Sequence, residues 1–263
     1  MSNHPISRRR LLAGLPLASV GIAGCSASPS SSDGEQFDSV SVEDATLVVS
    51  LADGASLTQV NVIAPDGTDF TSADVVDGQT RLEIPLGTTY EPGEYRLIGE
   101  PRGEASIVIQ PDLRIREFGA GANNPDRMPS ALGTATDDEA LVAIENRGSG
   151  PTAIQALEFG GDVPNPTESR EDGESGIFDP DTGRWNADQV VLGAGTQLTL
   201  FSSSLPFSFA GQEATCSSMP ETGTVTVRVE HSVRDSSKTA SFQVTYNEAS
   251  SGDCDITIGD RVS

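Results

Sequence analysis

The chain has 263 residues, of which 16 are basic and 39 acidic, and its formal net charge at pH 7 is −23. This charge argues against nucleic acid as a partner, because the phosphates would be repelled. Hydrophobic residues make up 36% of the chain, so a folded core is expected. The acids are spread along the chain, and we interpret them as a solvated surface, with binding of cations or basic partners as the alternative.

Lysine is almost absent, since Lys238 is the only one in the chain. An acidic excess with so little lysine resembles the composition of proteins from extreme halophiles, many of them archaeal. At molar salt the Debye length is about 3 Å, so self-repulsion is screened while the high charge keeps the protein soluble. We therefore expect the fold to lose stability when salt is diluted.

The N-terminal region is predicted to be an export signal. Arg8 and Arg9 precede an apolar run, Leu11–Ala23, which is interrupted by Pro16. The run is too short for a membrane span, which needs about 20 residues, but it suits the hydrophobic part of a signal peptide. The paired arginines resemble a twin-arginine export signal, and the small residues ahead of Cys25 resemble a lipobox.

The lipobox resemblance implies that residues 1–24 are cleaved and that Cys25 is lipidated, which places the chain on the outer face of the cell membrane. A stray cysteine in a discarded signal and a retained signal anchor are the alternatives. Cleavage leaves about 240 residues with a formal charge of about −26. Residues 25–37 have low hydrophobicity and are predicted to form a disordered tether.

Residues 38–111 are predicted to form a small Ig-like β-sandwich. Short β-branched or alternating segments are separated by turn dipeptides such as Asp53-Gly54 and Asp66-Gly67. The predicted strands are Thr46–Leu51, Leu57–Ile63, Arg81–Leu86, Glu94–Ile98 and Ala105–Ile109. Tyr95 is interpreted as a core or corner tyrosine of this sandwich.

Residues 112–263 are predicted to form a second, larger sandwich, because Pro111-Asp112 marks a boundary and the strand pattern then resumes. The predicted strands are Leu113–Phe118, Ala140–Glu145, Thr152–Phe159, Gln189–Leu192, Thr196–Phe201, Thr224–Glu230, Thr239–Tyr246 and Asp255–Ile258. Residues 119–138 are predicted to be a long loop, and the acidic residues 160–176 an exposed one.

Two stretches of the second domain resemble CARDB-type archaeal surface repeats. They are the turn from Asn146 through Gly148 to Pro151, and the segment from Gly176 to Trp185 with its continuation to Leu200. The resemblance covers roughly residues 112–246 and implies an Ig-like sandwich on a cell surface, with no catalytic residue. It does not extend to the acidic 160–176 loop, to Phe207–Phe209, or to the cysteine pair.

Cys216 and Cys254 are an even pair if Cys25 carries lipid. Export places them in an oxidising environment, so a disulfide is predicted, with two free buried thiols as the alternative. Thr224–Glu230 and Thr239–Tyr246 are predicted to form a hairpin that turns at residues 234–237. Val227 would lie opposite Val244, and the cysteines would lie just past the open end of this hairpin.

Asp179, Asp181 and Asp188 have a spacing that is similar to calcium-binding loops. We favour a hairpin turn instead, since proline and glycine occupy turn positions between them. Trp185 is interpreted as a plug of the sandwich core, with sugar stacking as the alternative, and His231 as a solvated histidine. No nucleophile motif, phosphate loop or metal-binding histidine pair is present, so we predict no catalytic residue, metal or cofactor.

Together these features predict an all-β protein with two Ig-like sandwiches, exported and lipid-anchored. Its predicted function is a non-enzymatic surface module for adhesion, envelope organisation or protein binding. One alternative is an accessory lipoprotein that presents a ligand to a transporter, which requires a ligand-sized pocket between the domains. Another is a hydrolase, which requires clustered acids with raised pKa values in a cleft.

Overall fold

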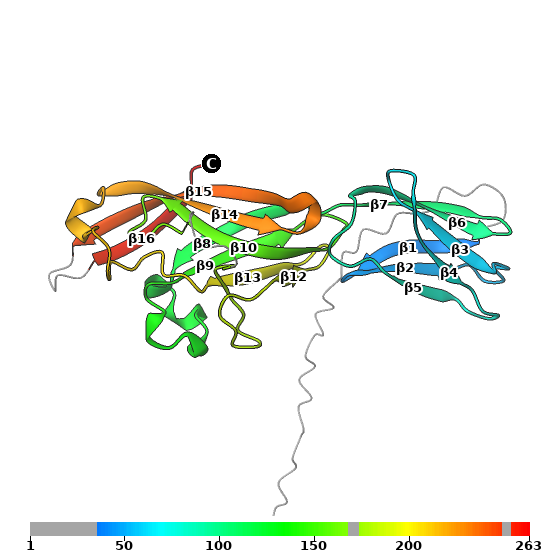
Figure 1. Ribbon diagram of the computed structural model, residues 1–263, viewed down its shortest axis with the longest axis horizontal. Coiled ribbons are helices and arrows are strands. Elements are labelled where there is room, and N and C mark those ends of the chain that lie inside the picture. The colour runs from blue at the N-terminus through cyan, green and yellow to red at the C-terminus, as the bar shows by residue number, and fades with distance from the viewer. Residues whose placement is uncertain (1–35, 168–173, 249–253) are drawn as a thin grey trace, which may run out of the picture.

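The computed structural model describes residues 36–167, 174–248 and 254–263 (Figure 1). The predicted signal, Arg8, Arg9, Cys25 and most of the predicted tether lie outside these residues. The described chain is all-β and forms two β-sandwiches, as predicted. The tether prediction is wrong at its end, because Gln36 and Phe37 are buried and Phe37 packs into the core of the first sandwich.

The first sandwich contains seven antiparallel strands in two sheets, and the chain crosses between the sheets after β2, β4 and β5, in an Ig-like manner. One sheet has the order β1 (Phe37–Glu43), β2 (Thr46–Leu51), β5 (Arg81–Pro85). The other has the order β4 (Asp69–Asp74), β3 (Gln59–Ile63), β6 (Gly93–Glu100), β7 (Glu104–Ile109). Strands β1 and β4 were not predicted, since both are edge strands with few apolar residues.

Tyr95 on β6 confirms the corner-tyrosine interpretation. Its side chain is 1% exposed, and its hydroxyl donates to the carbonyl oxygen of Glu91 at 2.9 Å, four residues upstream. The ring also packs edge-on against Phe70, with ring centroids 5.4 Å apart. This contact closes the corner before β6, as in other Ig-like sandwiches.

The second sandwich pairs a five-stranded sheet with a four-stranded one. The larger sheet has the order β12 (Val190–Leu192), β10 (Thr152–Gly161), β14 (Thr222–His231), β15 (Ser236–Glu248), β16 (Cys254–Arg261). The smaller has the order β11 (Ile177–Phe178), β13 (Gln197–Ser202), β9 (Ala140–Asn146), β8 (Leu113–Ala120). Phe118 lies at the centre of the core, with its ring 5.5–5.9 Å from those of Phe159, Phe207 and Phe242.

The β14–β15 hairpin has the predicted buried face but a different register. Val227 pairs with Ala240 rather than with Val244, which pairs with Gly223. The turn comes earlier than residues 234–237, because the chain reverses directly after His231 with Arg234 and Asp235 at positive φ. The partner moves by an even number of residues, so Val227 and Val244 still enter the same core.

The predicted loop at 119–138 contains three short 3₁₀ helices, η1 (Gly121–Asn123), η2 (Pro125–Arg127) and η3 (Ser130–Ala135). They cover the outer face of β9 and β13. A small second core results, formed by Met128, Leu132, Leu141, Phe178 and Phe201. The predicted exposed loop at 160–176 is also wrong in its described parts, because its two ends pack against β10.

The two sandwiches meet at a joint organised by the buried side chain of Asn146. Its Oδ1 accepts from the backbone N–H groups of Asp112 at 3.1 Å and Gly148 at 3.0 Å. Its Nδ2 donates to the carbonyl oxygens of Gly150 at 2.8 Å and Gly193 at 3.1 Å. One side chain therefore ties the interdomain linker to the β9–β10 turn, the segment whose asparagine and glycines the sequence singled out.

The β14–β15 turn holds the same joint from the other side. Val233 is 2% exposed and packs into the core of the first sandwich, while Ser232 donates its hydroxyl to the carbonyl of Thr88. The hydroxyl of Tyr90 donates to the carbonyl of Pro151 at 2.9 Å. The sandwiches are therefore fixed end to end along the long axis of the molecule (Figure 1).

We expect Asn146→Ala to lower the free energy of unfolding by about 2–4 kcal/mol, because it leaves several buried backbone groups at the joint without partners. Asn61→Ala is the control, since Asn61 makes one exposed hydrogen bond to Glu100. Denaturant unfolding of both variants at one salt concentration checks this. Equal, small losses in the two variants would contradict the role assigned to Asn146.

Candidate functional site

The chain enters the first sandwich at the pole opposite the second. The carbonyl of Gln36 accepts from the N–H of Ala52, and a Cβ on Gly103, in the β6–β7 turn, would lie 3.0 Å from the Gln36 side chain. Strand β7 runs from this turn to Ile109, whose side chain lies close to Gly150 of the joint. The start of β1 and the joint are therefore at opposite ends of the first sandwich.

The pole of the second sandwich farthest from the joint carries long connections: residues 121–139, residues 162–176 in their described parts, and residues 203–221. The predicted Cys216–Cys254 disulfide is present here, with Cα atoms 5.4 Å apart. Cys254 does not continue the β14–β15 hairpin, because it begins β16 and pairs with Glu248 of β15. The bond joins the 203–221 connection to this added strand.

Glu139 is a buried carboxylate at the same pole that the sequence did not identify. Its side chain is fully buried, and neither carboxylate oxygen has a hydrogen-bond partner. Burial raises the pKa of Glu139 to about 8, and the neighbouring Asp138 contributes. In the sequence it belongs to an acidic run that is typical of an exposed loop, so its burial is not predicted.

The raised pKa of Glu139 does not make it a candidate catalytic acid, because a substrate cannot reach its side chain. The N–H of Gly121 donates to its backbone carbonyl at 2.8 Å, which holds the covering segment in place. A catalytic acid must reach the reacting group directly or through one water. Because none of its side-chain surface is exposed, Glu139 is a strained structural group rather than a catalytic one.

The three aspartates with calcium-like spacing do not converge. Asp179 accepts hydrogen bonds from the N–H of Asp181 at 3.0 Å and the hydroxyl of Thr182 at 2.7 Å, as in a closed turn. Asp188 forms an ion pair with Arg184 at 2.9 Å. The favoured hairpin turn is thus observed, and in the described part of the chain no three metal-ligating side chains gather.

Two predictions about single side chains are wrong. Trp185 is 44% exposed and packs edge-on against Phe178, because the 179–184 turn carries it to the outside of the short strand β11. His231 is 4% exposed, with Nδ1 at 3.3 Å from the hydroxyl of Thr152. Strand β14 ends at His231, one residue beyond its predicted end, and this places the ring in the joint. Burial there, together with the charge of Lys238, lowers the pKa of His231.

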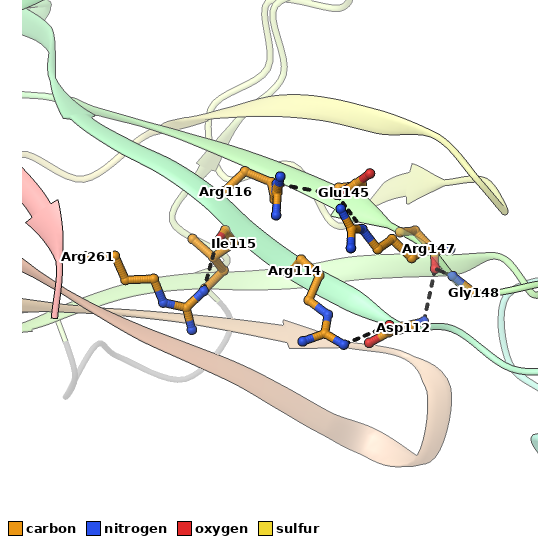
Figure 2. Close-up of polar contacts among 9 residues, drawn as sticks. Asp112, Arg114, Ile115, Arg116, Glu145, Arg147, Gly148 and Arg261 are labelled. Atoms are coloured by element: carbon orange, nitrogen blue, oxygen red, sulfur yellow. Dashed lines mark hydrogen bonds and ion pairs between the residues drawn. The ribbon is translucent and has the colours of Figure 1, made fainter. Parts of the chain in front are cut away.

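The most unusual surface of this acidic chain is a group of basic side chains along β8, which we call the basic face. It comprises Arg114, Arg116, Arg147 and Arg261, which Figure 2 shows, together with Lys238, which lies beside Arg114 and Arg261. Arg114, Lys238 and Arg261 line a small cavity of about 170 Å³. No sequence pattern predicts this group, because its members come from β8, from the turn after β9, and from β15 and β16.

The basic face has more positive charge than its own acids neutralise. Arg116 and Arg147 share one carboxylate, that of Glu145, at 3.3 and 2.9 Å. Arg114 pairs with Asp112 at 3.1 Å, while Arg261 donates to the backbone carbonyl of Ile115 at 3.2 Å (Figure 2) and to a backbone oxygen of Ser263 at 2.7 Å. Arginine is suited to binding carboxylates through two parallel hydrogen bonds. The arrangement can therefore bind an anion.

Comparisons with known proteins do not assign a family. No family model matches the chain, and a search of curated proteins finds no match. A β-glucuronidase from glycoside hydrolase family 2 is 11% identical over 80% of this chain and 19% of its own, with a TM-score of 0.25. A glycosyl hydrolase family 2 member from Bacteroides cellulosilyticus is 15% identical over 81% and 28%, with a TM-score of 0.22.

A further solved structure, alpha-2-macroglobulin from Escherichia coli, is 13% identical over 82% of this chain and 21% of its own, with a TM-score of 0.19. The chain thus spans between 19% and 28% of the length of these three proteins. Similarity at this level assigns no activity. Separately, the described residues contain no helix that is long and apolar enough to cross a membrane.

We expect Glu139→Gln to raise the melting temperature at pH 7.5, by an amount equivalent to about 1–3 kcal/mol, because glutamine does not ionise and so removes the cost of keeping a carboxyl protonated in the folded chain. The folded pKa of Glu139 is about 8 and the ordinary value is 4.5. Between these values the unfolded chain releases a proton that the folded chain retains, so wild-type stability falls as pH rises.

The variant should lack this fall, and its advantage should vanish below pH 4.5. Glu104→Gln, an exposed change on β7, is the control for altered net charge. Melting curves from pH 4 to pH 9 distinguish the two. A Glu139→Gln advantage that is the same at every pH would contradict the assignment.

We expect the double variant Cys216→Ser, Cys254→Ser to lose up to about 4 kcal/mol of unfolding free energy. The bond closes a loop with a sequence separation of 38, and the chain-entropy treatment gives this magnitude. Unfolding curves with and without a thiol reductant check the expectation. Reduction should lower the stability of the wild type to that of the variant and leave the variant unchanged, and any other pattern is evidence against the staple.

Proposed function

We propose that this protein is a lipid-anchored, non-enzymatic module of the cell surface that binds another protein. The observation that supports this best is the fixed end-to-end arrangement of the sandwiches, with the chain entering at the pole opposite the joint. A chain attached at Cys25 in this arrangement has the whole first sandwich between its anchor and its second sandwich.

A rigid joint has a physical consequence for such a module. A flexible tether of a dozen residues reaches about 20 Å, and its random motion alone gives no defined orientation. Because Val233 and Asn146 lock the sandwiches together, the second sandwich moves with the first as one body. Its faces and its long connections are then displayed away from the membrane, where a partner can reach them.

The alternatives find less support. The accessory-lipoprotein hypothesis needs a ligand pocket between the domains, but Val233 and Tyr90 fill that region. A cavity of about 670 Å³ lies instead along β6 and β7 of the first sandwich. The hydrolase hypothesis needs acids with raised pKa values in an accessible cleft, and Glu139 is sealed.

We expect Cys25→Ser to release the protein from the membrane or to leave its signal uncleaved, because the lipid has no other attachment point in the proposed scheme. Fractionation of cells at their native salt, with surface biotinylation of intact cells, measures this. Cys216→Ser with Cys254→Ser is the matched control, since it removes cysteines without removing the anchor. A correctly trimmed Cys25→Ser protein that remains with the membrane, unlabelled from outside, contradicts the proposal.

A further inference from the structure

Two arginines of the first sandwich have no partner among the described residues. They are Arg96 on β6 and Arg102 in the β6–β7 turn, and both residues are exposed. Every other arginine in that part of the chain binds a carboxylate or a backbone carbonyl. A guanidinium has five N–H donors, so Arg96 and Arg102 retain their full capacity to bind a ligand.

Both arginines line the same cavity of about 670 Å³, which we call the arginine pocket. It lies along β6 and β7 of the first sandwich (Figure 1). Its lining includes Glu94, Arg96, Ile98, Arg102, Glu104 and Ser106. The strand residues among these alternate along β6 and β7, and Arg96 lies opposite Ser106. They therefore share the outer face of the sheet, opposite the buried core residues of β6.

The turn that carries Arg102 is held in place by its neighbours. The N–H of Gly99 donates to the carbonyl of Gly103 at 2.8 Å, and the carbonyl of Glu100 accepts from the N–H of Thr58 at 2.8 Å. A Cβ on Gly103 would lie 3.0 Å from the side chain of Gln36, so the turn packs against the start of β1. Fixing the backbone of Arg102 in advance lowers the entropic cost of binding a ligand there.

The arginine pocket is balanced in charge, and this decides which kind of anion suits it. Glu94 accepts a hydrogen bond from the hydroxyl of Ser106 at 2.9 Å, while the Glu104 side chain has no partner among the described residues. A small inorganic anion is attracted by the two arginines and repelled by the two glutamates. A ligand with both carboxylates and hydroxyl donors matches both pairs, and sugar acids have this combination.

A polypeptide segment is a poorer match for the arginine pocket. The backbone of β6 is paired with β3 on one side and with β7 on the other, and β1 of the opposite sheet packs beside β7. A peptide therefore gains no strand pairing with β6 and has to bind through side chains, while ordering its backbone costs free energy. A polysaccharide offers its carboxylates and hydroxyls on rigid rings.

We propose that the arginine pocket binds an acidic polysaccharide. Arg96 and Arg102 bind the carboxylates of its sugar units through paired hydrogen bonds, and Glu104 accepts hydrogen bonds from ring hydroxyls. The half-buried Ile98 provides an apolar contact for a C–H face of the ring. At molar salt the Debye length is about 3 Å, so direct contacts of this kind carry the binding. The inference goes beyond the proposed function, because it adds a ligand that is not a protein.

The test measures the binding of a fluorescent tetramer of galacturonic acid to the purified chain at molar salt by anisotropy. We expect Arg96→Gln with Arg102→Gln to weaken binding about tenfold or more, because both carboxylate-binding groups are lost. Arg114→Gln with Arg116→Gln removes the same charge from the basic face and should leave binding unchanged. The opposite pattern places the sugar on the basic face and overturns the proposal.

Glu104→Gln distinguishes a sugar site from a general anion site. Removing a negative charge strengthens the binding of a plain anion, whereas replacing a charged acceptor by a neutral one weakens hydrogen bonds from sugar hydroxyls. We expect the tetramer to bind the variant about threefold or more weakly. Unchanged or tighter binding overturns the sugar assignment in favour of a general anion site.

Two further probes use the wild-type chain, so they do not depend on how a variant folds. The fully methyl-esterified tetramer keeps its hydroxyls but has no charge, and its equal binding would exclude the role of the arginine pair. Tetraglutamate carries the same number of carboxylates and should bind about tenfold more weakly than the sugar. Equal or tighter binding of this peptide overturns the proposal in favour of an acidic segment of a protein.

Thermal melting of each variant shows whether it is folded. Undiminished binding of the tetramer by the folded Arg96→Gln, Arg102→Gln variant excludes the arginine pocket as the site. The readout requires neither a membrane nor a protein partner, so failure here is distinguishable from failure of the anchoring at Cys25.

Discussion

The insertion of Val233 into the core of the first sandwich is the contact on which the two-domain structure depends. Fully burying a valine contributes about 1.5–3 kcal/mol, and this residue belongs to the second sandwich. Hydrogen bonds across the same boundary reinforce it: Ser232 donates to the carbonyl of Thr88, Tyr90 donates to the carbonyl of Pro151, and Asn146 accepts from the N–H of Asp112 in the linker. Because the joint consists of packed core residues and hydrogen-bonded polar groups, it holds the two sandwiches in one orientation.

Close backbone approach makes the joint selective for residue type. A Cβ on Gly148 would lie 2.2 Å from the carbonyl oxygen of Gln110, and one on Gly150 would lie 2.1 Å from the hydroxyl of Tyr90. These distances are far below van der Waals contact, so the two glycines allow the β9–β10 turn to touch the first sandwich. The same turn supplies Asn146, so a few neighbouring residues position one domain on the other.

The acidic residues of this molecule form a solvated surface, and two local groups of charges depart from that pattern. At Glu139 a carboxyl is enclosed and its pKa rises, since an ion in an apolar site without partners is unfavourable. Along β8 the excess is basic, and Glu145 is shared by two arginines. Both exceptions lie on the second sandwich, the domain with the larger core and the longer connections.

The sequence by itself determined the fold class, most strands and the disulfide. Alternating β-branched residues predict strands without reference to the rest of the chain, as at Thr46–Leu51, and the even pair of cysteines predicted the disulfide between Cys216 and Cys254. The buried face of the hairpin was also predicted correctly although its register was wrong, because side chains alternate along a strand with a period of two and the register moved by an even number of residues. These properties depend on neighbours along the chain.

Only the tertiary structure decided which side chains are enclosed and which meet. His231 and Glu139 are buried and Trp185 is exposed, each against or outside the sequence-based expectation, because exposure depends on how the segments of the chain pack together. The basic face likewise assembles bases separated by more than a hundred positions, from Arg114 to Arg261. Strand order places them together, and no local pattern encodes strand order.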